Sequence, residues 1–169
     1  MRHLIPSENN AIEPRGASGS QKFGIVFWQK TGFLRHCNHL GFQSMITLIH
    51  NKFSPTDIQN YGEHCFIQFD HHEDKVIYLA LKKESDSKHY FIYGEAQTVY
   101  TDAEFHILAL NVVSYISKQI GCKFFVNDAT GYLEHRSLEK WNEYMQDVMD
   151  MPIDEKTGAQ PLLEQVFYL

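Results

Sequence analysis

A series of short apolar segments in the middle of the chain, separated by polar turns, sets the strongest limit on the fold. These segments are residues 64–69, 75–81 and 89–93. They are rich in aromatic and β-branched side chains, as β-strands are. The polar residues 71–74 and 84–87 that separate them are typical of tight turns. Because turns this short join antiparallel neighbours, we expect a meander of three or four strands, with residues 97–100 as the candidate fourth.

The segments on either side of this series predict further elements. Strands are expected at residues 23–28 and 122–126, and helices at residues 38–53, at 101–120 and after Ser137. Ser54 and Pro55 match the N-cap and first position of a short additional helix. Thr101 and Glu104 form a capping box for the helix at 101–120. In the last helix we expect an inward face made of Leu138, Trp141, Met145, Val148 and Met149.

Together these elements predict a single α+β domain. We expect an antiparallel sheet of about four to five strands with helices packed on one face, formed by residues 22–169. A chain of 169 residues can bury about 70% of its unfolded surface, which is enough for one core. Residues 1–21 have linker composition and are expected to form a flexible arm. Residues 161–169 are apolar, so we expect them to dock on the domain.

Charge and cysteine content restrict the classes of function. A net charge of −6 argues against direct binding to nucleic acid, since such proteins normally carry a basic excess. The sequence contains no apolar run of the roughly 20 residues that a membrane-spanning helix needs. Three widely spaced cysteines and an N-terminus without an apolar signal region favour a reducing compartment. We therefore expect a cytoplasmic protein.

Histidines and cysteines are candidate metal ligands or catalytic groups. His36, Cys37 and His39 lie close in sequence, as do His64 and Cys65, but neither group has the paired short spacing of a closed zinc site. The chain also lacks a Gly-x-Ser-x-Gly elbow and a glycine-rich phosphate loop. We expect no catalytic residue, no metal and no cofactor, although an enzyme that uses His and Cys residues stays open as an alternative.

Two segments near the C-terminus are candidate partner-binding sites. The turn at residues 127–132 ends with Tyr132 and is followed by His135 and Arg136, and the rigid or multidentate side chains of these three residues suit an interface. From Glu134 onward there are eight acidic and three basic residues, so this segment carries most of the net negative charge. On the last helix, the acids are spaced to form one outward face, which comprises Glu139, Glu143, Asp147 and Asp150. Such a face is either solvated surface or a steering surface for a basic partner.

The segment Phe-Phe-Val-Asn-Asp-Ala-Thr-Gly-Tyr at residues 124–132 resembles segments of the immunity proteins of bacterial polymorphic-toxin systems. The resemblance implies a protein that binds a cognate toxin domain tightly and covers or distorts its active site. Many of those toxins are nucleases with basic clefts, which an acidic helix would match. We therefore expect a cytosolic toxin-neutralising protein, with an enzyme or a ligand-binding regulatory domain as alternatives.

Overall fold

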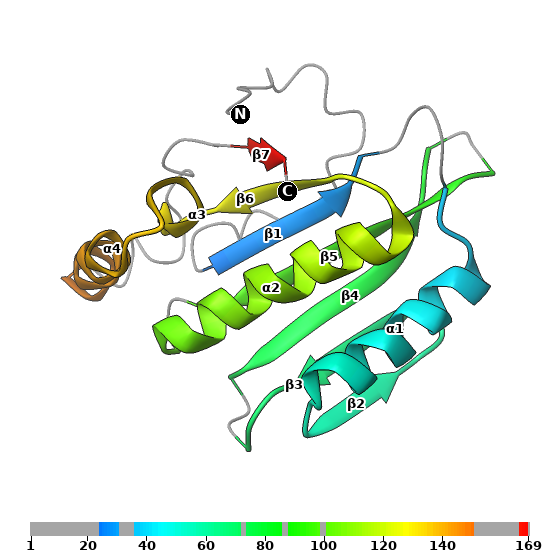
Figure 1. Cartoon of the computed structure of the whole chain (residues 1–169), viewed down its shortest axis with the longest axis horizontal. Coiled ribbons are helices and arrows are strands. Elements are labelled where there is room, and N and C mark those ends of the chain that lie inside the picture. Colours follow the sequence, from blue (N-terminus) through cyan, green and yellow to red (C-terminus); the bar gives the residue numbers. More distant parts are fainter. Residues whose placement is uncertain are drawn as a thin grey trace.

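In the computed structural model the chain is described at residues 24–30, 36–71, 74–85, 88–98, 101–150 and 166–168. The strands are β1 (Gly24–Gln29), β2 (Asp57–Asn60), β3 (His64–Gln68), β4 (Val76–Lys83), β5 (Tyr90–Gln97), β6 (Phe124–Asp128) and β7 (Val166–Tyr168). The helices are α1 (His39–Phe53), α2 (Ala103–Ile120), α3 (Tyr132–His135) and α4 (Leu138–Asp150). Figure 1 shows all of these elements.

The strands form one sheet in the order β2-β3-β4-β5-β1-β6-β7, and every neighbouring pair is antiparallel. Strands β2 to β5 follow one another in space as in sequence, so an antiparallel meander is confirmed. Its fourth strand is β2 rather than residues 97–100: Gln97 ends β5, and residues 99–100 lie outside the described part. Helices α1 and α2 lie side by side on one face of the sheet (Figure 1). The α+β class, the antiparallel sheet and the helices on one face are confirmed. The sheet has seven strands rather than four to five, because the short strands β2 and β7 extend it.

The main core lies between the sheet and the two long helices. Strand alternation turns Ile25 and Phe27 of β1 toward the helices, where α1 contributes Phe42 and Ile49 and α2 contributes its own apolar stripe. Phe27 packs directly over Gly94 of β5, and a Cβ there would lie only 2.2 Å from its ring. Glycine is therefore required at that position by the close approach of the ring.

A second, smaller cluster lies on the opposite face of the sheet. It consists of strand residues, namely Val26, Trp28, Ala80, Phe91, Tyr93 and Phe125. Trp28 and Phe125 stack across β1 and β6 with ring centroids 5.7 Å apart. All six residues are buried, so this half of the second face belongs to the interior. On the half formed by β2, β3 and β4, in contrast, side chains such as Phe66 are exposed.

The prediction that a short helix starts at Ser54 and Pro55 is wrong. Ser54 instead terminates α1 with a left-handed backbone (φ 48°), and its N–H bonds the carbonyl of His50. The chain then extends, Thr56 bonds the carbonyl of Gln68, and β2 pairs with β3. Cross-strand pairing has overridden the local N-cap signal.

Two details of the other helices also differ from the prediction. The N-cap of α2 is Asp102 rather than Thr101, because the Asp102 carboxylate accepts a hydrogen bond from the Phe105 N–H at 2.8 Å. Gly121 ends this helix in the left-handed conformation that a C-terminal glycine favours. In α4, Trp141 is buried and Met145 half-buried, as expected, but Leu138 is 51% exposed. Leu138 is the first residue of α4, and the buried contacts of this helix begin only one turn later, at Trp141.

The ends of the domain are described in part. Residues 166–168 form β7, which pairs with β6, so the expected docking of the C-terminal segment is confirmed for these residues. The expected arm at residues 1–21, the rest of the segment 161–169, and the side chains of Val148, Met149 and Asp150 lie outside the described part. Among the described residues, no helix combines the length and apolar character needed to cross a membrane.

Candidate functional site

The face of β2, β3 and β4 that points away from the helices is a polar and aromatic surface. Alternation along β3 buries Cys65 and Ile67 beneath α1 and turns His64, Phe66 and Gln68 to the other side. The antiparallel register then places Phe66 opposite Tyr78 of β4. This surface follows directly from the short alternating strands of the sequence.

Four rings form a continuous row on this face, which we call the aromatic stripe: Tyr61, His64, Phe66 and Tyr78. The ring centroids of Tyr61 and His64 are 5.1 Å apart in a stacked arrangement. Those of Phe66 and Tyr78 are also 5.1 Å apart, and His64 contacts both of these rings at 6.2 Å. Tyr61 is 61% exposed and Phe66 39%, which makes them two of the four large hydrophobic side chains exposed within the described residues.

The stripe continues into the buried half of the face. Tyr78 contacts Tyr93 with centroids 6.4 Å apart, and the Tyr93 hydroxyl donates to the Glu95 carboxylate at 2.6 Å. Burial, together with nearby Glu95, raises the pKa of Tyr78. Burial and the hydrogen bond to Glu95 raise the pKa of Tyr93 as well. Both phenols therefore stay protonated and uncharged at neutral pH.

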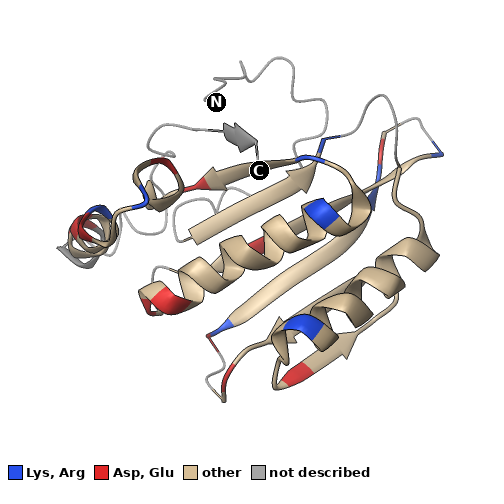
Figure 2. Ribbon diagram, viewed as in Figure 1, with Lys and Arg blue, Asp and Glu red and all other residues tan. Residues whose placement is uncertain are grey.

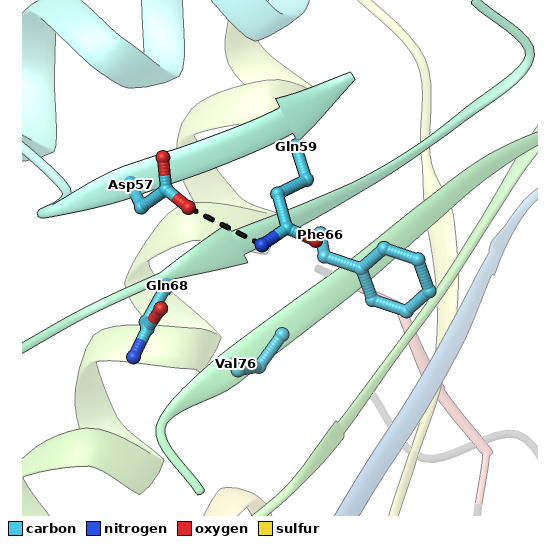
Figure 3. Close-up of a pocket in the computed structure, with 5 residues that line it drawn as sticks. All are labelled: Asp57, Gln59, Phe66, Gln68 and Val76. Carbon is cyan, nitrogen blue, oxygen red and sulfur yellow. Dashed lines mark hydrogen bonds between the residues drawn. The ribbon is translucent and has the colours of Figure 1, made fainter. Parts of the chain in front are cut away.

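A pocket of about 270 Å³ opens beside the stripe, lined by Asp57, Gln59, Phe66, Gln68 and Val76 (Figure 3). The five side chains come from β2, β3 and β4 and project from the same face of the sheet. The Gln59 amide donates to the Asp57 carboxylate at 3.4 Å, and the Tyr61 hydroxyl donates to the Gln59 oxygen at 3.5 Å. Polar groups are thus arranged around an exposed ring, as in a binding site.

The acidic face predicted on α4 is exposed as far as its side chains are described. Glu139, Glu143 and Asp147 are exposed, whereas the side chain of Asp150 is outside the described part. Figure 2 shows both acidic (red) and basic (blue) positions on the ribbon of α4. Lys140 forms an ion pair with Glu143 at 2.7 Å. The helix is held by Trp141, whose ring centroid lies 6.5 Å from that of His106.

The three residues expected after the turn have different surroundings. Tyr132 is half-buried and packs edge-on against the His106 ring at 5.7 Å. His135 and Arg136 are exposed, and the Arg136 N–H bonds the Tyr132 carbonyl to close α3. Tyr132 is therefore fixed to the core, and only the other two offer free surface.

The turn itself belongs to a buried hydrogen-bond network that the sequence analysis did not identify. His106 Nδ1 lies 2.5 Å from the Thr98 hydroxyl, and His106 Nε2 lies 3.2 Å from the Asp128 carboxylate. Asp128 also accepts hydrogen bonds from the N–H groups of Thr130 and Leu133. Burial alone would raise the pKa of Asp128, but His106 and the hydrogen bonds from the Thr130 hydroxyl and the Leu133 N–H outweigh burial and lower it. The signal available in the sequence was His106 itself, a polar residue on the apolar stripe of a helix.

The Thr98–His106–Asp128 arrangement has the order of a hydrolase triad, but its surroundings do not suit catalysis. Thr98 and His106 are fully buried and Asp128 is 5% exposed, so a substrate has no access to the hydroxyl. The network instead ties together the end of β5, helix α2 and the turn after β6. Its function is structural.

The histidines and the cysteine near residue 37 make contacts with protein groups rather than forming a metal or catalytic site. The rings of His36 and His89 stack with centroids 3.6 Å apart, and His39 bonds Glu63 at 2.9 Å. Burial raises the pKa of the Cys37 thiol to about 11, so Cys37 is not a thiolate at neutral pH. The described residues contain no group of three or more His, Cys, Asp or Glu side chains placed to hold a metal ion.

Sequence reasoning missed Tyr61, His64, Phe66 and Tyr78 as site residues. The signal was the alternation in residues 64–68, which places successive side chains on opposite faces of the strand.

Comparison of the chain with protein-family models, with curated proteins and with solved structures gives no match.

Proposed function

We propose that this chain is a binding protein that neutralises a cognate protein toxin in the cytoplasm by tight association. The observation that carries the binding part is the aromatic stripe with its exposed Phe66 and Tyr61. Aromatic residues dominate the binding energy of protein interfaces because they offer large, rigid contact areas. Three of its rings, those of His64, Phe66 and Tyr78, stand on the paired strands β3 and β4, so most of the stripe is preorganised for a partner and loses little entropy on binding.

The acidic face of α4 supports a partner with a basic surface. Glu139, Glu143 and Asp147 are exposed, and one of them is partly compensated by Lys140. A predominantly acidic face of this kind accelerates encounter with a basic partner and disfavours direct contact with nucleic acid. A toxin such as a nuclease, with a basic substrate cleft, is the partner that this charge fits. The resemblance of residues 124–132 to immunity proteins favours the same class.

Two observations favour binding over the enzyme alternative. The hydroxyl, imidazole and carboxylate that are arranged like a triad are buried, and Cys37 is held as a thiol. In contrast, the polar side chains of Asp57, Gln59 and Gln68 line an open pocket beside Phe66. The three cysteines, all of which lie in the described part of the chain, form no disulfide bond, which supports a reducing cytoplasm.

The test is site-directed photo-crosslinking in the source cells. A photo-reactive phenylalanine analogue is placed at position 66, and a control at Leu40, which is 77% exposed on α1. We expect one protein to crosslink at 66 and not at 40. That protein, expressed alone, should arrest growth, and co-expression of this chain should restore growth.

Two results would contradict the proposal. If no protein crosslinks at position 66, this face is not a binding surface. If the crosslinked protein causes no growth arrest, the face binds a partner, but the partner is not a toxin. As a quantitative check, Phe66→Ala should weaken the affinity for the captured protein at least tenfold, whereas Leu40→Ala should leave it unchanged.

A further inference from the structure

We infer that the pocket beside Phe66 binds a guanidinium group, namely an arginine side chain that the partner presents to this face. The inference rests on the proposed function, because it names the group that the binding surface recognises. It is carried by the charge, the exposed ring and the hydrogen-bonding groups of the five residues that line the pocket.

Charge is the first argument. Asp57 is the one formally charged residue among those that line the pocket, and it is exposed on the short strand β2. Within the described part of the chain, no lysine, arginine or histidine forms an ion pair with it. Its contact there is the neutral amide of Gln59 at 3.4 Å, a long hydrogen bond. An incoming cation could therefore bind the Asp57 carboxylate without breaking an existing ion pair.

The ring of Phe66 is the second argument. It is 39% exposed and lines the same pocket as Asp57 (Figure 3). A cation placed over an aromatic face is attracted by the negative charge density of the ring. A guanidinium is planar and weakly hydrated, so it can stack on the ring while its edge bonds a carboxylate. Val76, at the other side of the pocket, offers an apolar contact for the methylene stem of the arginine.

Hydrogen-bonding groups distinguish arginine from other ligands. The carboxylate of Asp57 can accept two parallel N–H donors, which matches the fork of a guanidinium better than an ammonium. The amides of Gln59 and Gln68 add further acceptors on the same face. A nucleotide would bring its phosphate toward Asp57, which repels it, and an uncharged sugar would make no use of the carboxylate charge.

The experiment uses small probes, so it does not depend on the partner. The full-length protein, labelled with ¹³C in methyl and aromatic groups, is titrated with N-acetyl-arginine methylamide while the Val76 and Phe66 signals are followed by NMR. N-acetyl-citrulline methylamide, which has the same shape without the charge, is the matched control. Glucose and adenosine monophosphate represent the sugar and nucleotide classes.

We expect saturating shifts with arginine, with a dissociation constant in the millimolar range, and at least tenfold weaker binding of citrulline. Asp57→Asn should weaken arginine binding at least tenfold, and Phe66→Leu, which keeps an apolar side chain without the ring, severalfold. Glu104→Gln, a matched carboxylate-to-amide change on α2, should leave arginine binding unchanged. The amide spectrum of each variant reports whether the fold is retained.

Equal binding of arginine and citrulline, or stronger shifts with glucose or the nucleotide, would overturn the inference. Absence of shifts with arginine would do the same. These results are distinct from a failure of the proposed function, because crosslinking of a toxic protein at position 66 does not require arginine recognition. Arginine binding that is lost in Asp57→Asn supports the inference whatever the partner proves to be.

Discussion

Phe66 of β3 and Tyr78 of β4 lie directly opposite each other, with ring centroids 5.1 Å apart and planes inclined by 44°. The residues that flank Phe66 in sequence, Cys65 and Ile67, are fully buried under the helices on the other side of the sheet. Because alternate residues of a strand point to opposite faces, the buried contacts fix the register that brings the two rings together. The core thus holds the candidate binding surface in place.

Truncation of Phe66 should separate binding from stability. Phe66→Ala removes one cross-strand aromatic pair on a partly exposed face, so the free energy of unfolding should fall by only about 0.5–1 kcal/mol. Urea denaturation of Phe66→Ala, Tyr78→Ala and the double variant would measure the coupling between the rings. A loss above about 3 kcal/mol for Phe66→Ala would show that this residue is a core element instead.

The buried pair of His106 and Asp128 predicts a specific pH dependence. The pKa of Asp128 is lowered in the folded protein, so its stabilising contribution is complete above the ordinary carboxyl pKa. That contribution is lost as the pH falls through the lowered value. Asp128→Asn should therefore cost about 3 kcal/mol or more at pH 7 and reduce the loss of stability in acid. Urea denaturation between pH 7 and pH 3 would test this, and parallel curves for the two proteins would contradict it.

Asp102 should stabilise α2 more through its cap than through its ion pair. Its carboxylate accepts from the Phe105 N–H and from Lys75 Nζ, both at 2.8 Å. The Lys75 hydrogen bond first, and the Phe105 N–H second, lower the pKa of Asp102. Because this carboxylate is half exposed, the ion pair contributes little. Asp102→Ala should cost about 1–2 kcal/mol, and Asp102→Ser, which can still cap, should recover most of it.

Thermal unfolding of these two variants is a sufficient measurement. Equal melting temperatures for Asp102→Ala and Asp102→Ser would mean that the cap contributes nothing and that the ion pair with Lys75 dominates. Lys75→Met, which removes the cation alone, would then reproduce the whole loss.

The sequence predicted the parts of the fold that depend on local periodicity. The alternation in residues 64–68 and the apolar stripe of α2 define one face of each element, and both elements are where they were expected. Local signals failed where pairing between distant residues decided the outcome. Ser54 and Pro55 look like a helix start, but β3 offers a partner for the segment that follows and draws it into the sheet. The order of the strands, with β1 between β5 and β6, is also absent from any local pattern.

The candidate site was predicted less well, for a related reason. The outward face of Glu139, Glu143 and Asp147 on α4 follows from helical spacing alone, so their exposure was predictable. Predicting the aromatic stripe requires knowledge of the register between β3 and β4 and of the position of Tyr61 in the turn before β3. The buried network needs a helix residue, His106, to meet a strand residue, Asp128, which is 22 positions away. No spacing rule brings such residues together before the fold is known.

Neutralising the acidic face of α4 should affect association with the partner and leave the fold intact. The variant carries Glu139→Gln, Glu143→Gln, Asp147→Asn and Asp150→Asn. Loss of the exposed Lys140–Glu143 pair costs little because solvent screens it, and removal of like charges spaced along one helix face offsets part of that loss. Trp141 still anchors the helix, so the unfolding midpoint should change little.

The rate of association with the captured partner should fall severalfold at low salt, and its salt dependence should flatten, because charge complementarity acts mainly on the encounter rate. Stopped-flow mixing at low and high ionic strength would measure both effects, with Glu104→Gln on α2 as the control for a single exposed acid. At high salt the two proteins should associate at similar rates, since exposed charges are then screened within a few ångströms. Identical rates at low salt would remove α4 from the interface and leave the aromatic stripe, with Phe66 at its centre, as the surface that recognises the partner.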